Sequence, residues 1–219
     1  MNFIIENFSQ IILKISEHLF LSMLALALGV LVAVPLGLLI SRNEKAANFV
    51  IGVSSVLQTI PSLALLAIMV PIFGVGKLPA VLALFVYSLL PILRNTVLGM
   101  NSVNKDIVDA AKGMGMKASQ IIFKVQVPLS VGVIMSGIRL SAIYVIAWTS
   151  LAAYIGAGGL GEFIFNGLNN FNFPMIITGT IPITIMALII DGFLGLLENK
   201  LVPTFASKAQ SEGEIVWEN

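Results

Sequence analysis

Three charged residues, Arg94, Arg139 and Asp191, lie inside otherwise apolar stretches, so they are the first candidates for chemistry. An ionised side chain inside a bilayer is costly and usually pairs or faces a polar path. Arg139 follows Pro128 by eleven residues and Asp191 precedes Lys200 by nine, which places both at a similar depth at about 1.5 Å per residue. We predict an intramembrane ion pair between Arg139 and Asp191. The alternative, preferred for Arg94, is that each side chain extends to the headgroups.

Residues suited to enzymatic chemistry are scarce. The chain has one histidine, His18, and no cysteine, so a metal site, a disulfide and a Ser–His nucleophile pair all lack support. We expect no catalytic residue and no bound metal, and we interpret His18 as an interfacial residue at the edge of the first apolar run.

One glycine-rich run, residues 156–161, looks at first like a phosphate-binding loop. It lacks the Lys-Ser/Thr pair that such a loop carries, and it follows a membrane helix instead of a strand. We therefore predict a flexible external hinge. Its glycines are Gly156, Gly158, Gly159 and Gly161.

The composition is that of an all-α integral membrane protein. Hydrophobic residues make up 58% of the chain and charged residues 11%, and the mean hydropathy is +1.00, far outside the range of water-soluble domains. The first apolar run is too long for a removed signal peptide and should stay in the membrane. We expect lipid as the surrounding medium and no nucleic-acid partner.

About five transmembrane helices are predicted, each long enough to cross a hydrocarbon core of about 30 Å. They cover residues 18–40, 47–73, 78–100, 129–154 and 175–199. A sixth crossing over 156–173 is the alternative. Its asparagines would be costly in lipid, so we prefer a short external or re-entrant helix there. These asparagines are Asn166, Asn169, Asn170 and Asn172.

The chain is predicted to form a single transmembrane domain over 18–203, which contains a polar loop 101–128 and a glycine-rich loop with a short helix over 155–174. An external segment 1–17 precedes this domain, and a cytoplasmic polar tail 204–219 follows it.

Lysine and arginine are concentrated in the loops after the first, third and fifth spans. By the positive-inside rule these loops are cytoplasmic, so the N-terminus is outside and the C-terminus inside. The opposite loops carry only Lys14 and Lys77. In the first span, small residues recur every fourth position and indicate close helix packing. They are Ala25, Gly29, Ala33 and Gly37.

The loop 101–128 is a long polar island in this apolar chain. Asn104 can cap a short helix over 105–112, Gly113 and Gly115 can end that helix in a left-handed turn, and a second helix is expected over 117–125. Two alanines leave the first helix slim, which suits insertion into a cleft of another protein. We predict that this loop binds a soluble partner.

The order Asp109-Ala110-Ala111, three residues, Gly115, nine residues, Val-x-Val-Pro128 resembles a family signature. It is the cytoplasmic signature of binding-protein-dependent, type I ABC importer permeases, commonly Glu-Ala-Ala, Gly, then Ile-x-Leu-Pro. The resemblance implies a coupling helix that binds in an ATPase subunit. That subunit hydrolyses ATP and thereby moves the transmembrane helices between inward-facing and outward-facing arrangements. This chain would itself bind no cofactor.

A narrower resemblance covers most of the chain. The segments 58–62, 90–96, 137–139 and 155–161 look like those of permeases for osmoprotectants such as glycine betaine, carnitine and choline. That resemblance implies a separate extracellular or periplasmic substrate-binding protein, a second permease copy or paralogue, and a place in the bacterial cytoplasmic membrane.

Aromatic side chains offer a candidate substrate pathway, because aromatic faces attract quaternary ammonium groups. Those in or beside the third and fourth spans are Tyr87, Tyr144, Trp148 and Tyr154. The alternative is that they anchor the helices at the membrane interface. For the whole chain, the alternatives are an amino-acid importer, with methionine first, and a membrane scaffold that transports nothing.

Overall fold

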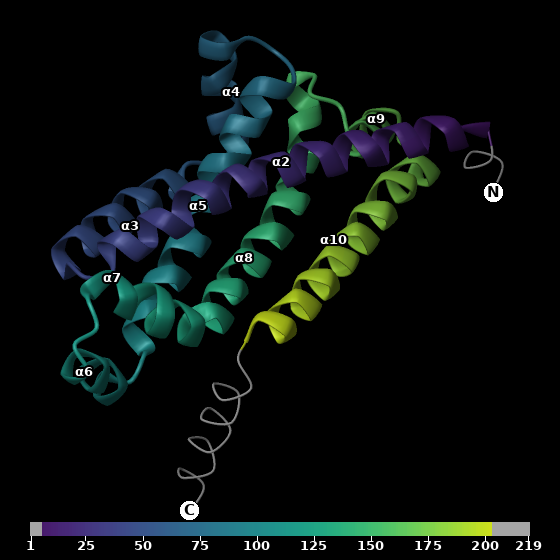
Figure 1. The fold of residues 1–219 in the computed structure, drawn as a ribbon. Helices are drawn as coiled ribbons and strands as arrows, with labels where there is room; N and C mark the ends of the chain where they lie inside the picture. Colours follow the sequence, from purple (N-terminus) through teal and green to yellow (C-terminus); the bar gives the residue numbers. More distant parts are fainter. Residues whose placement is uncertain (1–5, 203–219) are drawn as a thin grey trace, which may run out of the picture.

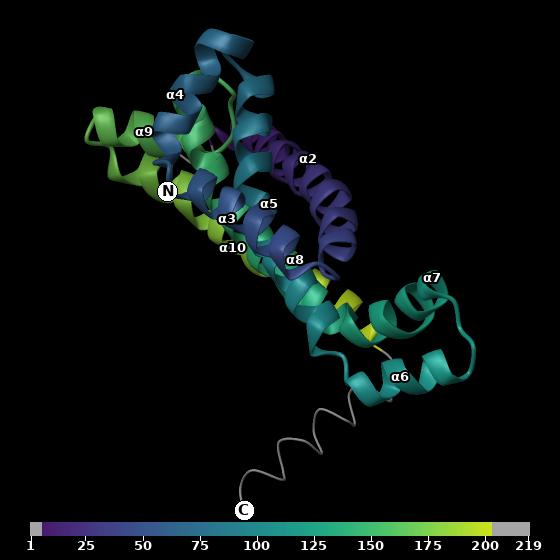
Figure 2. The same cartoon turned by 90° about the vertical axis from the view of Figure 1, so that its left-hand side faces the viewer.

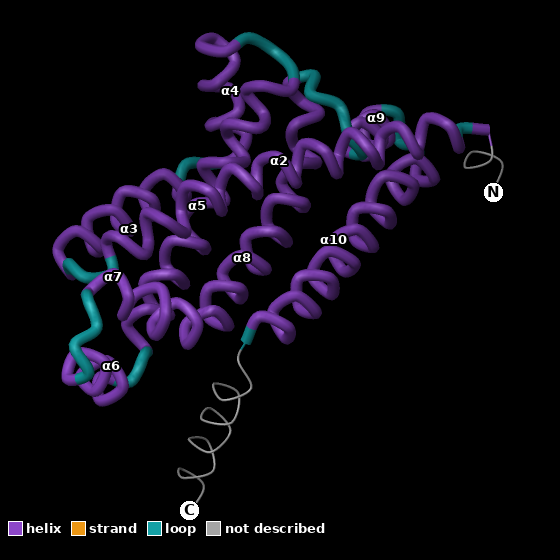
Figure 3. Tube along the Cα trace, in the orientation of Figure 1, coloured by secondary structure: helices purple, strands orange, loops and turns teal. Residues whose placement is uncertain are grey.

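The protein is described here by a computed structural model that covers residues 6–202, and this part is built from helices and the short turns between them (Figures 1 and 3). The predicted all-α class is confirmed. The elements are α2 (Phe8–Ile40), α3 (Glu44–Thr59), α4 (Ser62–Phe73), α5 (Lys77–Ser102), α6 (Lys105–Gly113), α7 (Ala118–Ile121), a π-helical turn η1 (Ile122–Gln126), α8 (Val127–Thr149), a 3₁₀ helix η2 (Ser150–Ile155), α9 (Gly161–Asn169) and α10 (Phe173–Leu201). The predicted tail 204–219 lies outside the described residues.

Within residues 6–202, four helical stretches are long and apolar enough to cross a membrane, and they match four of the predicted spans. They are α2, α5, the continuous run Ala118–Ile155 and α10, and the bent pair α3–α4 makes a fifth if it counts as one crossing. The helix α9 has nine residues, about 13 Å at 1.5 Å per residue, so it is too short to span. The short helix that we predicted in this region is thus present.

The helix that contains the first predicted span begins ahead of it. We predicted the span over 18–40, and α2 is helical from Phe8 to Ile40. The polar residues that suggested an external segment lie within this helix: Lys14 and Glu17 are one turn apart, and their side chains form an ion pair of 3.0 Å. Because both charges have partners, they do not end the helix.

The second predicted span is broken in the middle. The helices α3 and α4 meet at an angle of 94°, and α4 projects from the rest of the bundle (Figure 1). The break falls at Ile60, whose backbone is extended, with ψ of 127°. Pro61 follows it, and a proline disfavours the helical conformation of the residue before it.

The core lies where α5 packs between α2 and α8. The small residues predicted to form a packing stripe on the first span are all buried on α2. At Gly37 a Cβ would lie 2.7 Å from Thr96, and at Gly29 it would overlap the Ser88 hydroxyl. The stripe therefore lets the backbone of α2 approach α5 directly.

The last helix, α10, is the least enclosed span. It packs mainly on α8 and α9, and only 17% of its most apolar stretch is buried, compared with 61% for α5. Close contact at the α9 end is possible because Gly167 and Gly179 leave room for Ile176 and Ile164, respectively. Near its other end, α10 depends on polar contacts to α8.

Candidate functional site

The loop 101–128 projects from the bundle as a separate arm (Figure 2). The helix α6 begins as predicted, because the Asn104 side chain accepts a hydrogen bond from the backbone N–H of Asp106 at 2.8 Å. It ends at Gly113, and Gly115 then adopts a φ of +78°, the left-handed conformation that glycine adopts without steric cost. The arm is also attached to the end of α2, since Arg42 donates to the backbone carbonyl of Ala118 at 3.0 Å.

The signature residues occupy different faces of α6. Ala111 is buried at 2% exposure, whereas Asp109 and Ala110 are exposed. The Asp109 carboxylate lies 2.7 Å from the Lys112 ammonium, and both side chains are more than 60% exposed, so their pair contributes at most about 1 kcal/mol. Asp109 is thus held by a weak contact and remains available to a partner.

Two large apolar side chains of the arm are also exposed: Ile107 at 46% and Met114 at 75%. They are seven residues apart and therefore share a side of α6, which differs from the side of Asp109.

The second helix of the arm departs from the prediction. A separate helix was expected over 117–125, ending before Pro128. In the structure α7, η1 and α8 continue without a break, and the Val127 N–H donates to the carbonyl of Ile122, five residues back. Pro128 is the second residue of α8 and directly follows the π-helical turn, so its missing N–H falls within the continuous helix. The π-helical turn therefore carries the chain past the proline.

The candidate aromatic residues separate into two groups. Trp148 lies between Tyr87, with ring centroids 4.5 Å apart, and Tyr144, at 5.5 Å. Tyr154 instead packs on Phe165, at 4.2 Å. Tyr87 is 3% exposed and its hydroxyl donates to the carbonyl of Ile60 at 2.6 Å, so it supports the α3–α4 break. Tyr144 and Tyr154, at 39% and 61% exposure, are the accessible members of the predicted pathway, and that pathway stays a prediction.

Arg139 and Asp191 lie together, joined by two hydrogen bonds. The Arg139 Nε and Nη2 atoms are 2.9 and 3.0 Å from the two Asp191 carboxylate oxygens. A third residue, Glu198, accepts from Arg139 Nη1 at 2.8 Å. The guanidinium lies over Gly195, where a Cβ would be 3.4 Å from its central carbon. This triad connects α8 to α10, whereas Arg94 is exposed on α5.

The glycine-rich loop is packed more tightly than the predicted hinge. A Cβ at Gly158 would overlap the Glu17 carboxylate, one at Gly159 would lie 3.3 Å from the His18 ring, and one at Gly161 would overlap the backbone of Ser150. Only Gly156 has no neighbour within 4 Å of such an atom. Three of the four glycines thus allow the loop to approach α2 or η2 closely, and Gly156 has open space where a side chain would lie.

His18 is buried instead of interfacial, which corrects our interpretation. It is 0% exposed, and its Nε2 lies 2.9 Å from the carbonyl oxygen of Ile146. At this point the chain changes from α8 to the tighter η2, and the N–H of Ser150 turns to the carbonyls of Ala147 and Trp148. The Ile146 carbonyl loses its helical donor, and His18 replaces it.

Glu17, His18 and Glu198 were not among the predicted site residues. Glu198 is seven residues, or two helical turns, after Asp191, so its spacing was a usable signal. Glu17 is three residues after Lys14, which also predicts a shared helix face. His18 offered no such signal, because its partner is 128 residues away.

A family model described as "Binding-protein-dependent transport system inner membrane component" matches residues 25–203. The chain is 54% identical over 209 residues to the carnitine transport permease protein OpuCB of Listeria monocytogenes, covering 95% of this chain and 96% of the relative. It is 49% identical over 203 residues to the glycine betaine/carnitine/choline transport system permease protein OpuCB of Bacillus subtilis, covering 93% and 94%.

Solved structures share the fold at lower identity. Two structures of the MetNI methionine ABC transporter in inward-facing conformations align with TM-scores of 0.80 and 0.81, at 20% and 19% identity. They cover 88% and 90% of this chain and 96% and 99% of theirs. With the signature on α6, the helical architecture and the full-length similarity in agreement, this chain belongs to the family of inner-membrane permease components of binding-protein-dependent ABC importers.

Proposed function

We propose that this chain is the permease subunit through which an ABC importer passes osmoprotectants carrying a quaternary ammonium group, such as carnitine, choline and glycine betaine. The observation that carries the substrate class is the similarity, over nearly the full length of both chains, to permeases named for these solutes. The methionine alternative is supported only by a shared fold. A scaffold that transports nothing gains no support from any relative.

The orientation is proposed with the N-terminus outside and the C-terminus in the bacterial cytoplasm. The structure brings the basic segments to one end of the bundle: Arg42 contacts Ala118, and Gly132, near the start of α8, lies close to Glu198, near the end of α10. The opposite end holds Lys14 and Lys77 beside two carboxylates. This segregation of charge supports a cytoplasmic position for the loop 101–128.

The partners follow from the family and from the exposed face of α6. An ATPase subunit would receive α6 and supply all ATP hydrolysis, and a separate binding protein would deliver the solute outside. Two permeases of one named Bacillus subtilis system, OpuCB and OpuCD, are 49% and 38% identical to this chain. Their similarity supports a second permease of the same family as the subunit that pairs with this one.

Uptake into proteoliposomes tests the proposal. The complex of this chain with its ATPase, binding protein and second permease would receive labelled carnitine, choline, glycine betaine or methionine, with and without ATP. We expect ATP-dependent uptake of the quaternary amines. Methionine uptake alone would overturn the substrate class, and a stable complex without any flux would favour the scaffold.

The Asp109→Lys variant tests the coupling role of α6. We expect it to lose both uptake and solute-stimulated ATP hydrolysis, because it reverses the charge on the face presented to the ATPase. Lys112→Gln is the matched control: it removes the 2.7 Å partner of Asp109 within the chain but leaves Asp109 in place. Equal losses in both variants would mean that the pair inside α6 matters, not contact with the ATPase.

Aromatic substitutions test the substrate pathway. Tyr144 is 39% exposed and stacks on Trp148 at an interplanar angle of 26°, so its outer face is free for cation–π contact. We expect Tyr144→Leu to raise the half-saturating solute concentration, measured at saturating binding protein. Tyr154→Leu is the control, since that ring packs on Phe165. An equal effect of both variants would contradict a specific solute contact at Tyr144.

A further inference from the structure

We propose that Glu17 is a positioning residue that latches the glycine-rich loop onto α2, and that this latch opens when solute enters from outside. The inference rests on the proposed function and orientation, and it names the polar group that holds the outer end closed. Glu17 lies in the outer part of α2, and the loop it binds is 142 residues away in the sequence.

The carboxylate of Glu17 has contacts with three segments. One oxygen accepts the backbone N–H of Gly159 at 3.1 Å and the ammonium of Lys14 at 3.0 Å. The other lies 3.8 Å from the ammonium of Lys77 at the start of α5. Lys14 is also 2.8 Å from Glu162 at the start of α9. Together these side chains form a polar network of two cations and two anions, Lys14, Lys77, Glu17 and Glu162, whose formal charges cancel.

These contacts divide into a local one and three that cross between segments. The pair Lys14–Glu17 belongs to one turn of α2 and persists wherever the loop lies. The contacts of Glu17 with Gly159 and Lys77, and of Lys14 with Glu162, all join different segments. Movement of the loop would break the hydrogen bond from Gly159 to Glu17, and movement of α9 with it would break the pair Lys14–Glu162, while Glu17 stays paired with Lys14. Glu17 would therefore keep a cation beside it in both positions, which makes release possible at a site near the membrane.

The backbone of the loop is shaped to receive Glu17. Gly158 and Gly159, with φ of +90° and +85°, leave no space for a side chain against Glu17 and His18. Gly156, with φ of +70°, has open space around its Cβ position, and its N–H donates to the carbonyl of Ala153 at 3.1 Å. Two glycines thus seat the loop on α2, and a third forms the left-handed turn that joins it to η2.

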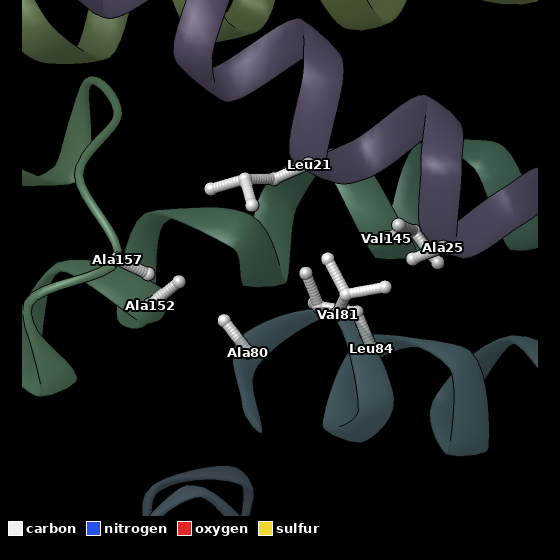
Figure 4. Close-up of a cluster of buried hydrophobic side chains, with 8 residues drawn as sticks. All are labelled: Leu21, Ala25, Ala80, Val81, Leu84, Val145, Ala152 and Ala157. Atoms are coloured by element: carbon white, nitrogen blue, oxygen red, sulfur yellow. The ribbon is translucent and has the colours of Figure 1, made fainter. Parts of the chain in front are cut away.

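The loop also has apolar contacts. Figure 4 shows Ala157 of the loop and Ala152 of η2 facing Leu21 and Ala80 at the edge of a buried cluster. Leu160 of the loop is 0% exposed and belongs to a second cluster with Ile146 and Phe163. The polar network therefore adds to these apolar contacts, through hydrogen bonds to a charged group that exceed neutral ones in strength.

Hydrogen exchange of the reconstituted complex tests the attachment. In Glu17→Ala the amide of Gly159 loses its acceptor, and we expect residues 156–161 to exchange about tenfold or more faster. Glu17→Gln keeps an acceptor but loses the charge, so its exchange rate should lie between those of the wild type and Glu17→Ala. Glu44→Ala is the control, because it removes an exposed carboxylate from the first turn of α3. Exchange in Glu17→Ala equal to that of the wild type would overturn the latch.

Functional readouts test whether the latch gates transport. We expect Glu17→Ala to raise ATP hydrolysis by the complex in the absence of binding protein, because the outer end would then open without the solute that the binding protein delivers. A purely structural role for Glu17 would lower expression and uptake without raising this basal hydrolysis, and that result would overturn the gating role.

A crosslink provides a test that keeps the hydrogen bond from Gly159 to Glu17, with the unbridged double variant as its reference. The chain contains no cysteine, so the double variant Lys14→Cys/Glu162→Cys can be bridged by a cleavable bifunctional thiol reagent with Glu17 left intact. We expect uptake to stop when the bridge forms and to return when it is reduced. Bridged complexes that import at the unbridged rate would overturn the latch alone. A wild-type complex that imports no solute would instead overturn the proposed function.

Discussion

Removal of Arg139 should destabilise the protein more than removal of either of its carboxylate partners. In Arg139→Gln, Asp191 and Glu198 would both lose the cation that lies within 3.0 Å of them. In Asp191→Asn, Arg139 keeps its 2.8 Å contact with Glu198. The triad carries one cation and two anions, so the first change leaves two uncompensated charges and the second leaves a neutral pair.

The exposures of the three side chains set the magnitude. They are 33%, 30% and 18% for Arg139, Asp191 and Glu198, respectively. Loss of one partner from a fully buried pair costs about 3–5 kcal/mol, and an exposed pair contributes about 0–1 kcal/mol. Partial exposure places Arg139→Gln between these limits, at about 2–3 kcal/mol, and Asp191→Asn at about 1 kcal/mol. Because α10 is the least buried span, few apolar contacts compensate for the loss.

Unfolding of the purified protein in mixed micelles, titrated with sodium dodecyl sulfate and followed by circular dichroism, measures these differences. The double variant Arg139→Gln/Asp191→Asn completes a cycle with the two single variants, from which we expect a coupling energy of about 1–2 kcal/mol. Arg94→Gln is the control: Arg94 is exposed on α5, and its loss should change stability by less than about 0.5 kcal/mol. Two results would contradict this ranking: a loss of unfolding free energy in Asp191→Asn as large as in Arg139→Gln, or a loss in Arg139→Gln as small as in Arg94→Gln.

Two further substitutions test the packing of the bundle in the same unfolding assay. Gly29→Ala should cost about 1–3 kcal/mol, because its Cβ would overlap a serine of α5. Gly52→Ala, with nothing within 4 Å, should instead stabilise by up to about 1 kcal/mol through helix propensity; equal effects would contradict the packing argument. Tyr87→Phe should cost about 1 kcal/mol by removing the 2.6 Å hydrogen bond at the α3–α4 break. Tyr144→Phe, half-exposed on α8, should leave stability unchanged, and a loss there as large as in Tyr87→Phe would argue against that bond.

Several features could be predicted because they depend on residues close together in the chain. A run of about 20 apolar residues is enough to define a membrane span, and the cap at Asn104 and the turn at Gly115 depend on neighbours within a few residues. The pairing of Arg139 with Asp191 could also be inferred, since distances counted from two helix ends gave similar depths. Family membership followed from the spacing of the signature on α6.

Other features depended on contacts that no local pattern contains. Glu17 and Gly159 are 142 residues apart, and His18 and Ile146 are 128 apart. The same glycine type serves for close approach at Gly158 and leaves open space at Gly156, and the sequence does not distinguish them.

From the sequence alone it follows that this chain is a helical membrane permease with a long polar loop between two spans, because apolar run length, charge segregation and motif spacing are local properties of the chain. Only the tertiary structure decided which polar groups meet at the two ends of the bundle. It placed Glu198 beside Arg139 and Glu17 beside the glycine-rich loop. A buried polar group is stabilised by whichever partner the packing of distant helices brings within hydrogen-bonding distance, and that choice exists only once the helices have assembled.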